Sequence, residues 1–380
     1  MRRTIEVGFL FSTDGTYRRM GQHGLAGAQH ALAEINRRRE YDFELKATHI
    51  NPQGYLHRYN EGAVALMQSG IRHLFGTTTS ASRKEIIPDL EQNASLLWYA
   101  CPYEGFESSE NVLYLGGCPN QTLIPLLRYA LSTFGKRAML VGSNYIWGWE
   151  SNRIAREVLQ AAHGDVVGEK YVHMGSTNFS DLVQFLLTEQ PSFVLNNLVG
   201  ESTYAFLRQL DAACVEHDMV LPVLSCNLTE AELVEVGEMQ NLRLLSCGPF
   251  FEGVDNAFTD SQFHVHGQRP CSHYYTGPYV ALNLFAEALH HVGNDEPEAI
   301  CNYLYAHAQD SVLGRLKISG RNNHSSLPCH IAELSEGRFV VVHSEARALP
   351  ADPYLTSTDL REFHRLRALA PVPHLRIVKK

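Results

Sequence analysis

The sequence predicts an α/β protein made of two similar lobes with a ligand cleft between them. Three observations support this prediction: strands alternate with helices along most of the chain, the alternation starts again near residue 123, and 380 residues suffice for two domains of ordinary size. The composition agrees, because 44% of the residues are hydrophobic and 19% are charged, which is typical of a chain that fills buried cores.

The first half begins with an apolar strand at 5–11, directly after a short charged start. A helix follows, in which Leu25, Ala28, Leu32 and Ile35 recur at the three- and four-residue spacing of a buried helix face. The same alternation predicts strands at 43–50, 71–75, 96–100 and 112–115, with helices at 59–69 and from residue 83 onward. Strands joined through helices pair in parallel, so helices should cover both faces of this sheet.

The second half repeats this pattern at similar size. It predicts helices at 123–134, 150–162, 179–188, 202–216 and 229–236, alternating with strands at 137–141, 166–173, 192–197, 221–225 and 242–247. Further helices are predicted at 279–292 and 296–308, and then antiparallel strands at 315–319, 330–334 and 339–343 with a turn at 335–337. The tail from Leu349 is rich in proline and basic residues and is expected to pack loosely.

Charge and hydropathy argue against two classes of function. The chain has 41 acidic and 32 basic residues, a net charge of −9, whereas direct binding of nucleic acid requires a basic face that displaces counterions. No apolar run approaches the 18 residues of a membrane-spanning helix, so no membrane association is predicted. A small ligand is compatible with both observations.

Motifs of known enzyme chemistry are missing, since the sequence has no P-loop, nucleophile elbow or zinc-protease motif. We therefore expect a protein that is not an enzyme and that needs no cofactor. The histidine groups at 264–266 and 271–273 lack a second ligand cluster and are interpreted as surface histidines, not as a metal site. Gly21, Gly24 and Gly27 are interpreted as a site of close helix packing.

Cysteine usage and the start of the sequence favour a cytoplasmic location. The eight cysteines show no C-x-x-C pair or regular spacing, which is typical of reduced thiols buried in a cytosolic protein. Residues 5–11 are interpreted as a strand and not as a signal peptide, because Glu6 interrupts the apolar stretch and no cleavage site follows. The alternative, a periplasmic location, applies if a leader precedes this sequence.

Neutral hydrogen-bonding residues gather where the predicted strands end, which is where open parallel sheets bind ligands. Ser80 and Ser82 precede a helix whose first N–H groups can donate to a ligand oxygen. Tyr99 lies at the end of the strand predicted at 96–100, and Tyr145 follows the strand predicted at 137–141, with other aromatic residues beside them. Helix capping or packing explains each residue taken singly, but together they favour a small, uncharged polar ligand held within an apolar wall.

Several segments together resemble a known family. They are GTTTSASRKEIIP at 76–88, YACPYEGFE at 99–107, GSNYIWGWESN at 142–152 and RNNHS at 321–325, with shorter matches at 119–121, 229–232, 331–333 and 352–354. This set resembles the AmiC-type amide receptors that repress aliphatic amidase expression, and more broadly the urea- and short-chain-amide-binding branch of the type I periplasmic binding proteins. The likeness extends from the first strand to about residue 355.

The resemblance implies two Rossmann-like lobes joined by three crossover segments, with the ligand enclosed by hinge closure. The crossovers are expected near 118–122, 247–252 and 326–332. Each lobe is then discontinuous in sequence, with residues 1–120 and 250–328 in the N-terminal lobe and residues 121–249 and 329–380 in the C-terminal lobe.

The resemblance also implies a ligand site without a metal or catalytic group. The expected ligand-binding residues are Ser80, Tyr99, Cys101, Pro102, Tyr145 and Asn227. Two positions depart from the family pattern. Cys101 replaces a threonine, which exchanges a firm hydroxyl partner for a weak sulfur one. Asn227 and Leu228 replace consecutive threonines, so the leucine removes a hydrogen bond while the asparagine can supply two.

Two functions follow from this resemblance. The first is a cytoplasmic sensor that binds a small neutral amide or urea-like ligand and thereby controls an RNA-binding antiterminator protein through lobe closure. The alternative is the substrate-binding component of an ABC importer for short-chain amides or urea. The exact ligand stays open at this point, as do the oligomeric state, with a homodimer as one option, and the identity of the partner.

Overall fold

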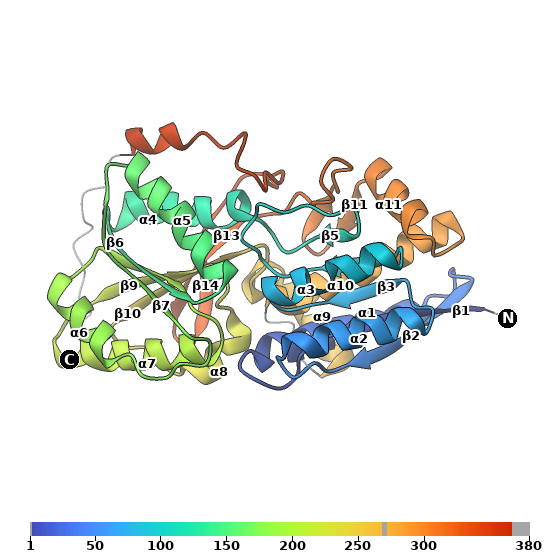
Figure 1. Cartoon of the computed structure of the whole chain (residues 1–380), viewed down its shortest axis with the longest axis horizontal. Coiled ribbons are helices and arrows are strands. Elements are labelled where there is room, and N and C mark those ends of the chain that lie inside the picture. The colour runs from blue at the N-terminus through green and yellow to red at the C-terminus, as the bar shows by residue number, and fades with distance from the viewer. Residues whose placement is uncertain (1, 268–271, 367–380) are drawn as a thin grey trace.

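Two lobes lie side by side along the longest axis of the molecule (Figure 1). The structure is a computed structural model, and it describes residues 2–267 and 272–366. The first lobe contains a parallel sheet of order β2-β1-β3-β4-β5. Its strands are β1 (Arg3–Leu10), β2 (Phe43–Ile50), β3 (His73–Gly76), β4 (Leu96–Tyr99) and β5 (Val112–Tyr114).

The second lobe contains a larger sheet of order β14-β13-β10-β9-β8-β6-β7. Strands β6 to β10 pair in parallel, whereas β13 joins β10, and β14 joins β13, in antiparallel fashion. The strands are β6 (Arg137–Ser143), β7 (Asp165–Val172), β8 (Phe193–Asn197), β9 (Leu221–Ser225), β10 (Leu242–Gly248), β13 (His330–Ser335) and β14 (Arg338–Ser344). The prediction of two α/β lobes is therefore confirmed.

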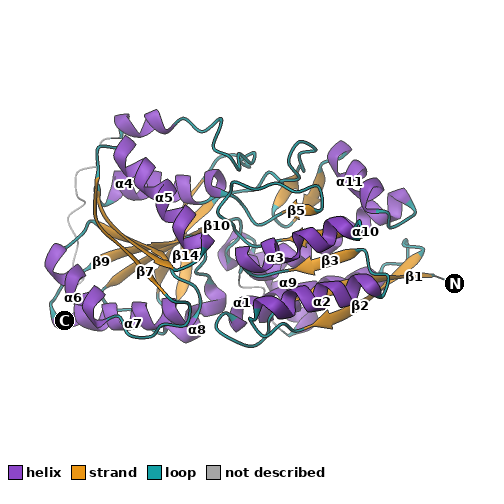
Figure 2. Ribbon diagram, viewed as in Figure 1, coloured by secondary structure: helices purple, strands orange, loops and turns teal. Residues whose placement is uncertain are grey.

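Helices surround both sheets (Figure 2). The first lobe carries α1 (Arg18–Arg37), α2 (Leu56–Gln68), α3 (Ser80–Gln92), α9 (Asn256–His266), α10 (His273–Val292) and α11 (Pro297–Ala306). The second carries α4 (Leu123–Thr133), α5 (Ile146–Ala161), α6 (Ser180–Glu189), α7 (Glu201–Glu216) and the short α8 (Leu233–Val236). One buried apolar cluster extends through both lobes, and each lobe adds a cluster of its own.

The glycines of α1 allow close packing, as the sequence predicted. A Cβ atom at Gly21 would overlap the carbonyl oxygen of Ser12, and one at Gly27 would overlap that of Tyr275 in α10. Because glycine has no Cβ, α1 can lie directly against the loop after β1 and against α10.

The three expected crossover segments are present. The chain passes between the sheets after β5, after β10 and again before β13. The carboxyl ends of the parallel strands of both sheets consequently face the boundary between the lobes (Figure 1). This arrangement is the one in which loops from two sheets build a shared ligand site.

Several element predictions were wrong for identifiable reasons. Helix α10 begins six residues before its predicted start at residue 279, because Gly277 and Pro278 look like a helix boundary in the sequence. Helix α9 was not predicted, since its buried residues are Thr259 and Gln262 rather than an apolar stripe. The predicted helix at 229–236 is a 3-10 turn followed by α8.

The end of the chain also differs from expectation. The predicted strand at 315–319 is shortened to β12 (Gly314–Leu316), which pairs with β11 (Gln309–Ser311) in a separate ribbon. The tail packs firmly as far as residue 366, because Leu349 pairs with Leu327 and the ring of Phe363 is buried next to α5. Residues 367–380 of this tail lie outside the described residues. Within the described part of the chain, no helix has the length and apolar character needed to cross a membrane.

Candidate functional site

A small cavity lies between the lobes, at the carboxyl ends of the parallel strands. Its volume is about 20 Å³, which is room for roughly one water molecule. The lining residues come from both lobes, namely Met20, Thr78, Thr79, Ser80, Pro102 and Tyr274 from the first and Tyr145, Trp147, Val199 and Asn227 from the second. Four of the six predicted site residues therefore meet here.

The lining carries no charged side chain. Its polar groups are hydroxyls, an amide and an indole, and the remainder is apolar. A charged ligand would lose its hydration here without gaining an opposite charge, which costs far more than desolvating a neutral polar group. The cavity is therefore suited to a small, uncharged molecule that forms hydrogen bonds.

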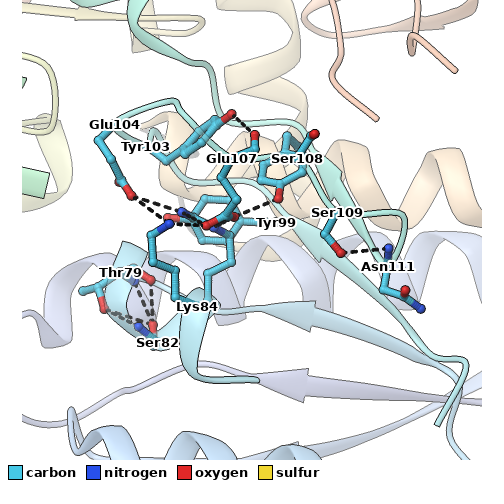
Figure 3. Close-up of polar contacts among 12 residues, drawn as sticks. Thr79, Ser82, Lys84, Tyr99, Tyr103, Glu104, Glu107, Ser108, Ser109 and Asn111 are labelled. Atoms are coloured by element: carbon cyan, nitrogen blue, oxygen red, sulfur yellow. Dashed lines mark hydrogen bonds and ion pairs between the residues drawn. The ribbon is translucent and has the colours of Figure 1, made fainter. Parts of the chain in front are cut away.

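The start of α3 forms the first-lobe wall. The backbone N–H of Ser82 donates to Thr79 Oγ1 at 3.2 Å, and that of Thr79 donates to Ser82 Oγ at 3.1 Å, so these two residues cap the helix (Figure 3). Ser80 Oγ has no hydrogen-bond partner within the described part of the chain. The structure thus separates the two serines of this loop: Ser82 caps the helix, and Ser80 is left available to a ligand.

A buried ion-pair network holds the 99–107 loop behind this wall. Arg83, fully buried on α3, donates from Nε to Glu107 Oε1 at 2.6 Å and from Nη2 to Glu104 Oε1 at 3.3 Å. Lys84 contacts the same two carboxylates (Figure 3). Burial alone would raise the pKa of Glu107, but the charge of Arg83 and the hydrogen bonds from Arg83, Lys84 and Tyr114 together outweigh it and lower the pKa to about 2. The loop is therefore fixed by charges that remain paired at neutral pH.

Tyr99 and Cys101 lie behind the cavity wall and do not line the cavity. The guanidinium of Arg83 stacks on the Tyr99 ring at 4.7 Å, and the Tyr99 hydroxyl donates to the carbonyl oxygen of Pro102 at 3.4 Å. Cys101 Sγ donates to the carbonyl oxygen of Thr77 at 3.6 Å, and burial raises the pKa of this thiol to about 12. Both side chains support the wall that Pro102 and Thr78 present to the cavity.

The second-lobe wall comes from the first turn of α5. Tyr145 is its N-cap residue, and burial raises the pKa of this hydroxyl, with the carboxylate of Glu104 adding to the effect, so that the phenol stays protonated. Trp147 is 5% exposed, and its Nε1 has no hydrogen-bond partner among the residues described. Tyr145 and Trp147, which both line the cavity, therefore each carry a neutral hydrogen-bonding group.

Asn227 lines the cavity, but its side chain is occupied within its own lobe. Nδ2 donates to the carbonyl oxygen of Leu198 at 3.0 Å, and Oδ1 accepts from Ser225 Oγ at 2.7 Å. Its main-chain oxygen accepts from the Tyr274 hydroxyl across the lobe boundary at 3.0 Å. Asn227 therefore shapes the loop and links the lobes, whereas the sequence suggested an amide free to make two bonds to the ligand.

Further contacts hold the lobes together beside the cavity. Arg18 on α1 pairs with Glu235 of the second lobe at 2.8 Å and with Glu201 at 3.3 Å, and Arg19 pairs with Glu235 at 2.7 Å. Gly200 lies so close to the carbonyl oxygen of Thr16 that a Cβ atom would overlap it. The lobes are thus closed around the cavity.

The histidine groups singled out in the sequence do not form a metal site in the described part of the chain, which holds no cluster of three potential ligands. His264 is exposed as predicted, whereas His266 is only partly exposed, because its ring stacks on His30 and its Nε2 contacts Glu34 Oε1 at 2.9 Å. His273 is also buried. Cys271 lies outside the described residues.

Comparison with protein-family models matches residues 5–359 to the periplasmic binding protein domain. The chain belongs to this family. The match shows the fold and a ligand-binding role. It does not identify an amide as the ligand.

Solved structures of periplasmic binding proteins share the fold. A solute-binding protein of an ABC transporter from Rhodopseudomonas palustris HaA2, in complex with p-hydroxybenzoic acid, is 16% identical, with a TM-score of 0.83 over 94% of this chain and 100% of that one. The branched-chain amino acid binding protein LivJ from Streptococcus pneumoniae, in complex with isoleucine, is 16% identical, with a TM-score of 0.78 over 91% of this chain and 100% of that one.

A shorter similarity connects the chain to a curated protein called limonene hydroxylase from Geobacillus stearothermophilus. It is 28% identical over 119 residues, which are 30% of this chain and 22% of that protein. The match therefore spans less than a quarter of that protein.

Sequence reasoning missed several residues of this periplasmic binding protein's cavity. Tyr274 was missed because it lies in the unpredicted first turn of α10. Thr78 and Thr79 stood in the hydroxyl-rich loop after β3, and Trp147 stood beside Tyr145, so position alone could have found them. Val199 follows β8, where the strand-end rule also pointed.

Proposed function

We propose that this chain is the substrate-binding component of an ABC importer for a small neutral amide or urea-type molecule. The observation that carries the proposal is the uncharged lining of the cavity between the lobes. Amides and urea are neutral, have an oxygen that accepts hydrogen bonds and have N–H groups that donate them. Ser80, Tyr145 and Trp147 provide hydroxyl and indole groups for such a molecule.

The family match and the similar structures support the importer role. Two solved proteins that share this fold are a solute-binding protein of an ABC transporter that holds p-hydroxybenzoic acid and a substrate-binding protein of a branched-chain amino acid transporter that holds isoleucine. Those two ligands carry a carboxylate at neutral pH, and isoleucine carries an ammonium group as well. The lining of this cavity holds no side chain of opposite charge for either group, which favours a neutral ligand instead.

A pair of ligands that differ in charge but hardly in size tests the proposal. Acetamide should raise the melting temperature of the protein and should give a binding isotherm in calorimetry, because a ligand that binds only the folded state stabilises it. Acetate should do neither at the same concentration. Isoleucine and 4-hydroxybenzoate serve as larger charged controls. Tighter binding of acetate or isoleucine than of acetamide would contradict a neutral site.

The second candidate is a cytoplasmic amide sensor that controls an RNA-binding antiterminator protein. The thiols favour it, because all seven cysteines in the described part of the chain are free and buried. The Sγ atoms of Cys247 and Cys329 lie 3.5 Å apart without a bond between them. In an oxidising compartment such a close pair is expected to be joined.

Thiol trapping separates the two candidates. Protein alkylated at once in denaturant, taken from cells that produce it naturally, should carry free Cys247 and Cys329 if it is a cytoplasmic sensor. A disulfide between them in that sample would favour the importer. For either candidate we propose binding without turnover, so acetamide incubated with the protein should be recovered intact, and release of ammonia would contradict this.

A further inference from the structure

The three tryptophans of the chain differ in what their indole N–H groups contact. Trp98 Nε1 donates to His73 Nδ1 at 3.2 Å, and Trp149 Nε1 donates to Asn144 Oδ1 at 3.0 Å. Trp147 Nε1 is buried and has no partner among the described residues. The tryptophan without a partner is the one that lines the cavity between the lobes.

A buried indole N–H without a partner is uncommon, because the group loses its hydrogen bonds to water and gains nothing in return. Such a group is tolerated where another molecule supplies the acceptor. We infer that the Trp147 indole N–H is the hydrogen-bond donor to the oxygen of the bound ligand and so determines its specificity. This inference rests on the proposed function and names a recognition contact that the proposal leaves open.

The position of Trp147 also determines when this hydrogen bond forms. Trp147 lies on α5 in the second lobe, whereas Ser80 lies at the start of α3 in the first lobe. A ligand that contacts Ser80 reaches the indole N–H only when the two lobes close on it. Because the cavity here has room for about one water molecule, a bound amide requires the lobes to lie slightly farther apart than in this structure. The hydrogen bond therefore stabilises the closed arrangement of the lobes only around a ligand that has an acceptor oxygen. The carbonyl group of an amide or urea supplies such an oxygen.

A matched pair of variants and a matched pair of ligands test the inference. Trp147→Phe keeps one aromatic ring and removes the N–H donor together with part of the ring surface, and Trp149→Phe makes the same change at an exposed tryptophan outside the cavity. In calorimetry, Trp147→Phe should bind acetamide about tenfold more weakly than the natural protein, as expected for one lost hydrogen bond. Trp149→Phe should bind acetamide as the natural protein does.

Thioacetamide separates a hydrogen bond to the carbonyl from a purely structural role of the tryptophan. Sulfur is a weak acceptor, so the natural protein should gain little from the indole N–H when it binds thioacetamide. The loss caused by Trp147→Phe should then shrink to about twofold or less with this ligand, a coupling of the kind that double-mutant cycles measure. A variant that is damaged in structure would lose affinity for both ligands equally, and this result would overturn the inference.

The remaining outcomes are also decisive. Equal affinity of Trp147→Phe and the natural protein for acetamide would overturn the inference while leaving the proposed function intact. If the natural protein binds neither acetamide nor urea, the proposed function fails and the inference fails with it. Tryptophan fluorescence adds a second measurement, since the emission change on adding acetamide should persist in Trp149→Phe and disappear in Trp147→Phe.

Discussion

The two walls of the cavity are built on different principles. In the first lobe, a buried ion-pair network centred on Arg83 and a capping box at the start of α3 hold the wall in place. In the second lobe, Tyr145 and Trp147 present polar groups that have no hydrogen-bond partner in the part of the chain described. This difference suggests a division of roles, in which the first lobe provides a preformed half-site and the second provides the groups that engage the ligand on closure.

The largest expected effect tests the rigidity of the first-lobe wall. Arg83→Met removes the buried cation from Glu104 and Glu107 and leaves only the partly exposed Lys84 beside them, so the free energy of unfolding should fall by about 3–5 kcal/mol. Urea unfolding followed by circular dichroism measures this change. Lys46→Gln is the control, since its pair with Glu6 is exposed and should contribute less than about 1 kcal/mol. A similar small loss for Arg83→Met would show that the network does not hold the wall.

The next effect concerns the groups that contact the ligand. Tyr145→Phe and Ser80→Ala each remove one hydroxyl from the closed cavity and should weaken acetamide binding by about 1–2 kcal/mol, with little change in melting temperature. Calorimetry at one temperature measures the acetamide affinity of both variants, and thermal unfolding measures their melting temperatures. Unchanged affinity in both variants would remove the proposed site, whereas a loss in only one would show which lobe determines affinity.

The sequence predicted the fold well because its signals are local. Apolar strands and amphipathic helices repeat at short range, and the strand-end rule then brings Ser80, Pro102, Tyr145 and Asn227 to one place. What the sequence could not show is which atoms of those residues are already used. The amide of Asn227 is occupied by Leu198 and Ser225, a contact between separate loops that no spacing in the sequence predicts.

Buried carboxyl groups also differ between the two lobes, and they make the stability of the folded protein depend on pH. In the second lobe, Glu230 and Glu232 have no ion-pair partner in the described residues, and burial raises the pKa of each to about 8. In the first lobe, burial raises the pKa of Glu107, but the charge of Arg83 and the hydrogen bonds that Glu107 accepts lower it to about 2. A carboxyl group whose pKa is raised by folding stabilises the folded state below pH 4.5, its pKa in the unfolded chain, and this stabilisation is lost as the pH rises through about 8. A carboxyl group whose pKa is lowered by folding stabilises the folded state above pH 4.5, and this stabilisation is lost as the pH falls toward 2.

Glu232→Gln tests the second-lobe half of this contrast. Glutamine resembles the protonated acid and can still accept from the backbone N–H of Thr229, as Glu232 does at 3.1 Å. The variant should match the natural protein at pH 5 and melt about 2–4 °C higher at pH 8.5, because the natural carboxyl must ionise there without a cation. Thermal unfolding at several pH values measures the difference. Parallel melting curves over the whole range would contradict the raised pKa.

The smallest expected effect concerns the ion pairs that join the lobes. Glu235→Gln removes a charged partner shared by Arg18 and Arg19 and leaves Arg18 its weaker pair with Glu201. Acetamide affinity should therefore fall about two- to fivefold at low salt, since each such pair is only partly buried. The difference should vanish in 1 M NaCl, where the Debye length is about 3 Å. Glu157→Gln removes a pair with Arg153 within the second lobe and is the control. Calorimetry at both salt concentrations should show that Glu157→Gln does not change the affinity for acetamide. If Glu235→Gln lost the same affinity at low and high salt, Glu235 would act through its packing rather than through its charge.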